Sequence, residues 1–200
     1  MNKSEEIVLI KDSKRGNLKA FELLILNYQQ KLYSFVLFFS DDQKRALEIS
    51  EDIFCECFVN IKKYKIETSF LQWLYKIAIK KFVNIDEKFI RNLGTRITNT
   101  QTDYKESLMS QISISTNSLG TDDADLRGNF TNAIIYCISK LDKHAKLFVV
   151  LKDFQNLSYT EIAEILNVEP NRVKIAVIDA RNKFESVVIK NKELFLLKNN

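Results

Sequence analysis

The sequence predicts an all-α protein built from two small helical domains and a connecting linker. Its 200 residues include four glycines and one proline, so few residues would interrupt long helices. Apolar residues recur at spacings of three and four in two separate parts of the chain, as amphipathic helices require. Between these parts the sequence becomes rich in Thr, Ser, Asn and Gln and loses the periodicity. The pattern favours two helical domains over a turn-rich β fold.

The first predicted domain spans residues 18–92 and contains three amphipathic helices. An apolar stripe over residues 21–39 predicts one continuous core helix. A second helix, over residues 46–64, interleaves apolar positions with acidic ones, which are expected to point outward. The third begins at the capping-box pattern Ser-x-x-Gln and covers residues 69–91.

Residues 93–128 are predicted to form a flexible, acidic linker. This segment carries five acidic and three basic side chains, although the whole chain has a formal net charge of +4. Two basic domains joined by an acidic linker indicate a protein that binds one polyanion through both domains. The second predicted domain spans residues 129–188, where helical periodicity returns and Asp142 is predicted to be the N-cap of its second helix.

A helix-turn-helix pattern lies within the second domain. Ser158 and Glu161 match a capping box, Asn167 suits a left-handed turn, and Pro170 suits the first turn of the next helix. That helix would bury an apolar stripe and turn its opposite face to DNA. The candidate DNA-contacting residues on that face are Asn171, Arg172, Lys174, Arg181 and Lys183. Taken alone, the pattern also fits an ordinary αα-hairpin.

Residues 151–184, LKDFQNLSYTEIAEILNVEPNRVKIAVIDARNKF, resemble the second conserved domain of extracytoplasmic-function (ECF) sigma factors. The segments AFELLILNYQQKLYSFVLFF, ALEISEDIFCECF and SFLQWLYKIAIKKF are similar to the first conserved domain, in the same order. The resemblance implies a region 2-like helical bundle and a region 4-like helix-turn-helix domain. It covers most of the chain outside the linker and the C-terminal tail.

The resemblance implies that the protein directs RNA polymerase core to specific promoters and initiates transcription by binding DNA and opening its strands. In the family, the first domain binds the polymerase clamp and melts the −10 element, while the second binds the polymerase flap and the −35 element. Many members are held inactive by an anti-sigma factor, which is therefore an expected partner. The implied polymerase-binding residues are Glu48, Glu51 and Asp52.

The implied contacts with the melted strand combine lysines for phosphates with aromatic rings for exposed bases. These residues are Lys62, Lys63, Tyr64, Lys65, Phe70, Trp73, Lys76, Lys80 and Lys81. Two plainer interpretations stay open. Large aromatics such as Trp73 and Phe70 commonly pack in a core, and the lysines could form an ordinary solvated face.

Three residues of the expected DNA-contacting helix depart from the family pattern. Ile175 and Ala176 stand where small polar and basic residues are usual, and Asp179 replaces a common basic residue. An acid facing phosphates is repulsive, so contacts with a −35 element could be few. The alternative function is a sigma-like binding protein that sequesters polymerase or an anti-sigma factor without contacting promoter DNA.

The sequence offers no enzyme motif. There is no Gly-rich phosphate loop, paired-carboxylate motif or nucleophile elbow, and the single histidine, His144, has no evident catalytic partners. Cys55, Cys57 and Cys137 form no CxxC pair, which argues against a disulfide framework or a zinc site. We therefore expect no catalysis, cofactor or metal, and an unrelated helical enzyme is only a distant alternative.

The N-terminus lacks the apolar stretch of a secretory signal, and no apolar run is long enough to span a membrane. The sequence thus predicts a soluble, cytoplasmic protein without membrane insertion.

Overall fold

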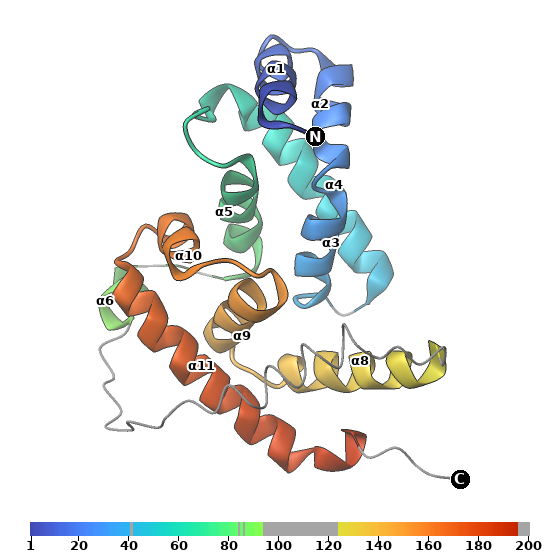
Figure 1. Cartoon of the computed structure of the whole chain (residues 1–200), viewed down its shortest axis with the longest axis vertical. Coiled ribbons are helices and arrows are strands. Elements are labelled where there is room, and N and C mark those ends of the chain that lie inside the picture. The colour runs from blue at the N-terminus through green and yellow to red at the C-terminus, as the bar shows by residue number, and fades with distance from the viewer. Residues whose placement is uncertain (41, 84, 86, 94–123, 196–200) are drawn as a thin grey trace. The chain divides into compact units, whose positions relative to one another are not determined.

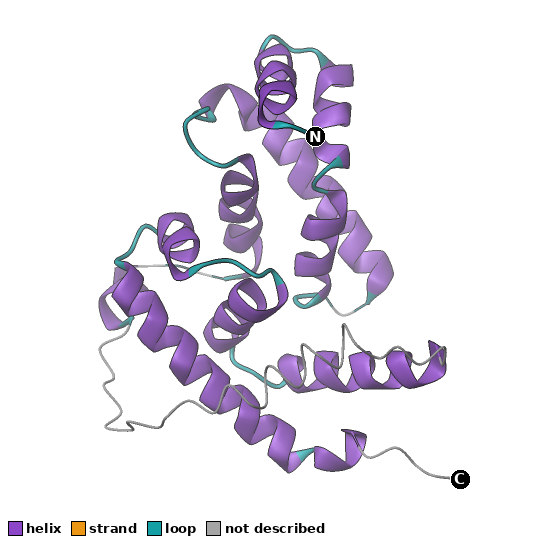
Figure 2. Cartoon of the chain, viewed as in Figure 1, coloured by secondary structure: helices purple, strands orange, loops and turns teal. Residues whose placement is uncertain are grey.

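The computed structural model describes residues 1–40, 42–83, 85, 87–93 and 124–195 (Figure 1). Within those residues all regular structure is helical, as Figure 2 shows, and the all-α prediction is confirmed. The chain divides into two units: residues 1–85 form most of the first, and residues 86–163 with 168–200 form the second.

The first unit contains five α-helices and a 3₁₀ turn. They are α1 (Lys3–Lys14), α2 (Leu18–Leu26), α3 (Gln29–Leu37), α4 (Gln43–Asn60), η1 (Ile61–Lys63) and α5 (Phe70–Phe82). Helix α1 has no counterpart among the predicted helices. It begins at a reciprocal capping box, in which Asn2 Oδ1 accepts from the Glu5 amide and Glu5 Oε2 accepts from the Asn2 amide.

The single helix predicted over residues 21–39 is wrong, because the chain breaks between α2 and α3 at Asn27 and Tyr28. The Tyr28 hydroxyl donates a hydrogen bond to Glu6 of α1 at 2.7 Å. The break between α2 and α3 therefore coincides with a contact to α1, which lies outside the predicted first domain. The apolar stripe nevertheless continues across it, since Leu24 and Leu32 are both fully buried. Periodicity therefore identified the core side chains without revealing that two helices carry them.

The third helix is also shorter than predicted, because α5 ends at Phe82 and not near Arg91. It begins as expected after Ser69, but the Ser69 side chain makes no capping hydrogen bond. Tyr75 of α5 is fully buried and its ring lies 5.2 Å from that of Phe35, which joins α5 to α3 in the core.

The described residues of the second unit form five α-helices, a π-helical turn and a final 3₁₀ turn. They are α6 (Glu87–Asn92), α8 (Ala124–Ser139), α9 (Lys143–Val149), η2 (Val150–Phe154), α10 (Tyr159–Leu166), α11 (Pro170–Lys190) and η3 (Lys192–Phe195). Most of the predicted linker lies outside the described residues, but residues 124–128 are already helical. The C-terminal turn packs on α8, with the rings of Phe195 and Phe130 5.5 Å apart.

Helix α11 packs against α9 along the predicted apolar stripe. Val173, Val177, Ala180 and Phe184 of this stripe are each at most 1% exposed. Asp142 caps α9 as predicted, accepting hydrogen bonds from the amides of His144 at 3.1 Å and Ala145 at 2.9 Å. The buried stripe fixes which side of α11 faces away from α9.

The predicted helix-turn-helix is confirmed in its local geometry. Ser158 Oγ accepts from the Glu161 amide, and Glu161 Oε2 accepts from the Ser158 amide, so the capping box forms in both directions. Asn167 has a φ of 56°, in the left-handed region, and the Val168 amide donates to the Ala163 carbonyl at 3.0 Å. Pro170 occupies the first turn of α11.

None of the described helices is long and apolar enough to cross a membrane. Among the described residues, no group of three or more His, Cys, Asp and Glu side chains could hold a metal ion.

The left-handed turn gives a direct test of the helix-turn-helix. Replacing Asn167 by valine puts a β-branched residue at positive φ, which should reduce the free energy of unfolding by about 1–2 kcal/mol. Asn167→Gly removes the same side chain without this strain and should leave stability close to that of the wild type. Urea unfolding followed by circular dichroism compares the two. Equal destabilisation by both changes would show that the lost side chain matters and the backbone conformation does not.

Candidate DNA and polymerase interfaces

A basic surface in the first unit follows η1 and α5. All six of its lysines are exposed: Lys62, Lys63, Lys65, Lys76, Lys80 and Lys81. Two of them also contact neighbouring side chains. Lys63 donates to Asn60 at 3.0 Å, and Lys81 lies 3.5 Å from Glu56 in an exposed ion pair. This η1–α5 lysine surface retains enough cationic groups to follow a phosphate backbone.

The aromatic residues predicted beside these lysines are mostly structural. Tyr64 is 2% and Phe70 1% exposed, so neither ring is accessible to a base. Their rings lie 5.5 Å apart, edge to face, and the Tyr64 hydroxyl donates to the carbonyl of Thr68. The expectation that both contact single-stranded DNA is therefore corrected: they hold the loop between η1 and α5 against the core.

Trp73 differs from those two aromatics because its side chain is only partly buried. Its ring lies 5.2 Å from Tyr64 and 5.6 Å from Phe70, so one side of the indole packs on the cluster. Among the three aromatic residues predicted to contact the melted strand, Trp73 is the one that keeps accessible surface beside the lysines. A base could stack there while the buried side keeps the ring fixed.

Helix α4 presents an acidic face with exposed apolar residues on it. The predicted polymerase-binding residues Glu48, Glu51 and Asp52 are all exposed, and Glu48 pairs with Arg45 at 3.2 Å. Leu47 is 53% and Val59 78% exposed on the same helix, which the sequence analysis missed. The signal was present in the sequence, since both are apolar residues outside the buried stripe of an amphipathic helix. Exposed apolar side chains beside charges are typical of protein-binding surfaces.

Three of the predicted DNA contacts lie in the first two turns of α11. Asn171, Arg172 and Lys174 are exposed there, and the N-terminal part of a recognition helix is the part that contacts base edges. Arg172 is already engaged, because its Nη1 donates to the carbonyl of Ile90 in α6 at 3.1 Å.

Arg181 has a different partner from the one predicted. Its Nε lies 3.0 Å from both carboxylate oxygens of Asp153, and its Nη2 also contacts this carboxylate. The Arg181 side chain is 15% and that of Asp153 6% exposed. The guanidinium therefore joins α11 to η2, and Asp153 already occupies its donors, so its assignment as a DNA contact is corrected. The partners are 28 positions apart in the sequence, so periodicity arguments could not predict this pair.

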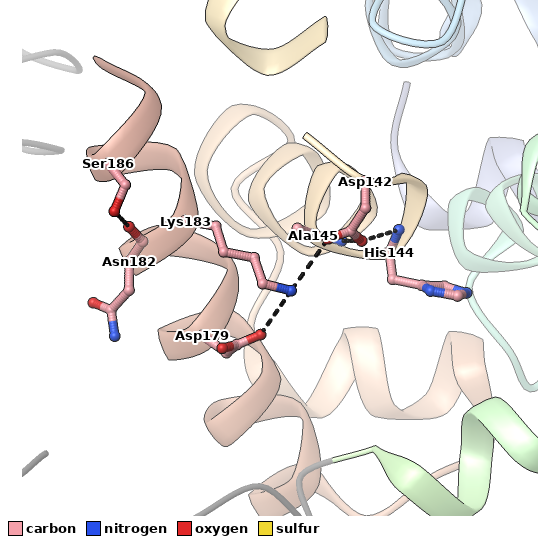
Figure 3. A network of polar contacts seen from close by, with 7 residues as sticks. All are labelled: Asp142, His144, Ala145, Asp179, Asn182, Lys183 and Ser186. Carbon is pink, nitrogen blue, oxygen red and sulfur yellow. Dashed lines mark hydrogen bonds and ion pairs between the residues drawn. The ribbon is translucent and has the colours of Figure 1, made fainter. Parts of the chain in front are cut away.

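Lys183, another predicted DNA contact, lies between two acids (Figure 3). Its Nζ is 3.1 Å from Asp142 and 3.1 Å from Asp179. Partial burial alone would lower the pKa of Lys183, but the two carboxylates outweigh it and raise that pKa. The contact between Lys183 and Asp179 also changes the expectation that Asp179 repels DNA, because the lysine compensates the negative charge of this carboxylate.

Asp142 belongs to the same network and links α9 to α11. Burial alone would raise its pKa, but hydrogen bonds from the Ala145 amide and Lys183 outweigh this effect and lower it. Figure 3 shows the carboxylate between the start of α9 and Lys183, with Ser186 bonded to the Asn182 carbonyl farther along α11. The network therefore couples a helix cap to the orientation of α11.

The three departures from the family pattern share one location. Ile175, Ala176 and Asp179 line a cavity of about 360 Å³ together with residues of α6 and α9, including Phe89 and His144. The His144 ring stacks on Phe89 with centroids 4.2 Å apart. This side of α11 thus faces a half-open pocket of its own unit, in which aromatic groups lie beside the charged Asp142 and Lys183.

Breaking the buried ion pair between Arg181 and Asp153 should destabilise the second unit more than breaking an exposed ion pair of α11. Arg181→Ala leaves a mostly buried carboxylate without its partner and should reduce the free energy of unfolding by about 3 kcal/mol. Lys183→Ala, the matched control two residues away, breaks exposed pairs and should cost less than about 1 kcal/mol. Chemical denaturation measures both. Similar costs for the two variants would contradict the structural role assigned to Arg181.

The lowered pKa of Asp142 makes its contribution pH-dependent. Asp142→Asn keeps a good N-cap but removes the charge paired with Lys183, so the variant should be less stable than the wild type at pH 7. A depressed carboxyl pKa stabilises the fold above the unfolded-state value of about 3.9, and this stabilisation is lost as pH falls through the folded-state pKa. Unfolding midpoints of the two proteins should therefore converge below about pH 4. A constant difference from pH 7 to pH 3 would rule out this ionic contribution.

Comparisons with known proteins agree with this architecture. The family model described as "Sigma-70, region 4" matches residues 131–184, which include α9, η2, α10 and most of α11. The RNA polymerase sigma-H factor of Pseudomonas aeruginosa is 22% identical over 189 residues, covering 94% of this chain and 96% of that protein. The ECF RNA polymerase sigma factor SigW of Bacillus subtilis is 29% identical over 176 residues, covering 84% and 88% respectively.

Two solved structures have the same fold. CnrH, solved in complex with the cytosolic domain of CnrY, has a TM-score of 0.63 at 16% identity and covers 94% of this chain and 99% of that one. The sigma factor RpoE, in complex with the anti-sigma factor NepR from Bartonella quintana, has a TM-score of 0.57 at 17% identity and covers 86% and 98%.

The region 4 match falls on the helix-turn-helix, and the full-length relatives extend the likeness over both units. The chain belongs to the extracytoplasmic-function family of RNA polymerase sigma factors, which are non-enzymatic transcription factors.

Proposed function

We propose that this protein directs RNA polymerase core to specific promoters and initiates transcription there by binding and opening DNA. The observation that carries the proposal is the helix-turn-helix, whose α11 exposes Asn171, Arg172 and Lys174 within the region matched by the sigma-70 region 4 model. Such activity uses binding energy alone and would take place in the cytoplasm, where polymerase and chromosome meet.

The first unit is proposed to bind the polymerase clamp and the −10 element. The acidic face of α4 supplies Glu48, Glu51 and Asp52, and the exposed Leu47 and Val59 add apolar area that a partner could bury. The η1–α5 lysine surface would hold the phosphates of the melted strand, and Trp73 would stack on a base. Stacking contributes about 1–3 kcal/mol per base, which is sizeable against the cost of unpairing it.

The second unit is proposed to bind the polymerase flap and the −35 element. Of the five DNA contacts expected on α11, we retain Asn171, Arg172 and Lys174. Arg181 and Lys183 are left out because carboxylates of the same unit hold both side chains. If three side chains of α11 contact DNA, the upstream promoter element that they recognise should be short, or its sequence should be weakly constrained.

An anti-sigma factor is the third proposed partner. The solved structure of RpoE is a complex with the anti-sigma factor NepR, and that of CnrH is a complex with a domain of CnrY. The apolar groups exposed on α4 of this chain offer a surface that such a protein could cover while keeping polymerase away.

Sequestration of polymerase or an anti-sigma factor without promoter contact is the competing function. It is favoured by the side of α11 that carries Ile175, Ala176 and Asp179, because this side lines a half-open pocket within its own unit. Transcription from defined start sites separates the two functions.

In vitro transcription tests the proposal with core polymerase, the full-length protein and a pool of genomic promoter fragments. We expect discrete, protein-dependent start sites. Trp73→Ala should reduce open-complex formation by roughly tenfold, the equivalent of one lost stacking interaction. The Lys80→Ala/Lys81→Ala double variant should weaken promoter binding more strongly at low than at high salt, because it removes phosphate contacts and the counterion release that accompanies them. Permanganate footprinting of unpaired thymines measures strand opening directly.

Ile189→Ala provides the control, since Ile189 is a 61% exposed apolar residue near the C-terminal end of α11. It should leave every start site unchanged. If the wild-type protein bound core polymerase but produced no start site on any fragment, the sequestering function would replace promoter recognition.

A further inference from the structure

Helix α1, which lies outside the predicted first domain, packs against α2 and η1 of the first unit (Figure 1). Glu6, Ile10 and Lys14 recur at every fourth position, so they lie on one side of this helix. Ile10 is 1% exposed, while Glu6 and Lys14 are half-buried on either side of it. Two charged side chains of α1 are therefore directed at the unit on which the helix packs.

Four aromatic residues form a cluster next to the η1–α5 lysine surface. They are Tyr28, Tyr64, Phe70 and Trp73, and together they are called the Trp73 cluster. Phe70 is central, because its ring centroid lies 5.1 Å from that of Tyr28, 5.5 Å from that of Tyr64 and 5.6 Å from that of Trp73. The orientation of the partly exposed indole therefore depends on the other three rings.

Both charged residues of α1 contact this cluster. The Tyr28 hydroxyl donates a hydrogen bond to Glu6 Oε1 at 2.7 Å, and Lys14 Nζ lies 6.0 Å from the centroid of the Tyr64 ring. A hydrogen bond to a carboxylate is stronger than one between neutral groups, so the first contact is the firmer of the two. Helix α1 is thus attached to two of the four rings.

The hydrogen bond from Tyr28 to Glu6 persists over the pH range in which transcription is measured. Burial, followed by the hydrogen bond to Glu6 and its negative charge, raises the pKa of Tyr28 well above its ordinary value. The hydroxyl therefore keeps its proton and remains a donor at neutral and mildly alkaline pH.

We propose that Glu6 and Tyr28 are positioning residues for promoter opening, and that they act on Trp73 through Phe70. The inference rests on the proposed stacking of Trp73 on a base of the melted strand. Such stacking is more favourable when the ring is already fixed, because a side chain that is ordered only on binding loses conformational freedom. Lys14 supports the same cluster from a second point on α1.

A purely structural role for these contacts would have a different consequence. The first unit also carries the proposed polymerase-binding face of α4, so partial unfolding of the unit would weaken polymerase binding and strand opening together. A displaced Trp73 would leave polymerase binding intact and reduce strand opening alone. The two effects can therefore be separated by measuring both quantities on the same variants.

Fluorescence tests the positioning without DNA or polymerase, since Trp73 is the only tryptophan of the chain. In the free full-length protein, Glu6→Ala and Tyr28→Phe should each increase the rate of acrylamide quenching by roughly twofold or more. A hydrogen bond to a charged group changes an equilibrium by roughly tenfold or more, of which the indole should show a part. The double variant should resemble either single one, because both remove the same bond.

Two conservative changes serve as controls. Glu6→Gln keeps an oxygen that can accept from Tyr28, so it should quench almost like the wild type. Tyr33→Phe also removes a tyrosine hydroxyl from α3, but Tyr33 is outside the Trp73 cluster, and it should have no effect. Thermal unfolding checks that every variant is folded.

Strand opening supplies the second measurement, made with core polymerase and a promoter found by transcription. Glu6→Ala and Tyr28→Phe should bind core polymerase with the affinity of the wild type, yet lower the permanganate reactivity of unpaired thymines by roughly threefold to tenfold. Glu6→Gln should restore strand opening. Equal losses of polymerase affinity and strand opening would overturn the positioning role.

The proposal requires both changes, so faster quenching without reduced opening, or the reverse, would overturn it. Its failure is distinct from that of the proposed function. Absence of any start site with the wild-type protein would refute promoter opening, and with it the role of Glu6 and Tyr28. Normal start sites combined with unchanged quenching and opening in the variants would refute the positioning role alone.

Discussion

The burial of one stripe of α11 against α9 is the constraint on which the second unit depends. Val173, Val177 and Phe184 are completely buried, so the rotation of the helix about its axis is fixed. That rotation decides which side chains are available to DNA and which are held inside the unit. Asp153 then binds Arg181 and locks the same orientation from η2. A recognition helix needs such rigidity, because contacts with base edges depend on a defined placement of each side chain.

This constraint divides the cations of α11 into two groups. Those at its start, Arg172 and Lys174, point to exposed positions, whereas Arg181 and Lys183 pair with carboxylates of α9, η2 and α11 itself. Net charge along a helix is therefore a poor guide to DNA contacts. The first unit shows a similar division among aromatics, since Tyr64 and Phe70 stabilise the loop on which accessible lysines lie, and Trp73 keeps partial exposure.

The elements that could be predicted from sequence are those fixed by neighbours in the chain. The capping box of Ser158 and Glu161, the left-handed Asn167 and the Pro170 helix start all depend on residues within three positions, and all three formed. Periodicity also identified the buried stripe of α11. By contrast, the break at Tyr28 accompanies a bond to Glu6, 22 residues away, and no local pattern contained it.

The candidate sites were harder to predict for the same reason. The partner of Arg181 lies 28 residues away and that of Lys183 41 residues away, so the sequence showed the cations without the acids that neutralise them. The departures Ile175, Ala176 and Asp179 were visible, but their common environment was not. Only folding brings them to one cavity with Phe89. The role of these three residues, which depart from the family pattern, can therefore be interpreted only from the tertiary structure.

The central claim, that the start of α11 contacts promoter DNA, is tested most directly by site-specific photo-crosslinking in the polymerase complex. A photoreactive amino acid at position 174 is compared with one at position 190, where Lys190 is exposed at the other end of the same helix. The account predicts that position 174 crosslinks to the upstream promoter element and that position 190 does not. Crosslinks to polymerase alone from position 174, with active transcription from the same promoter, would contradict it.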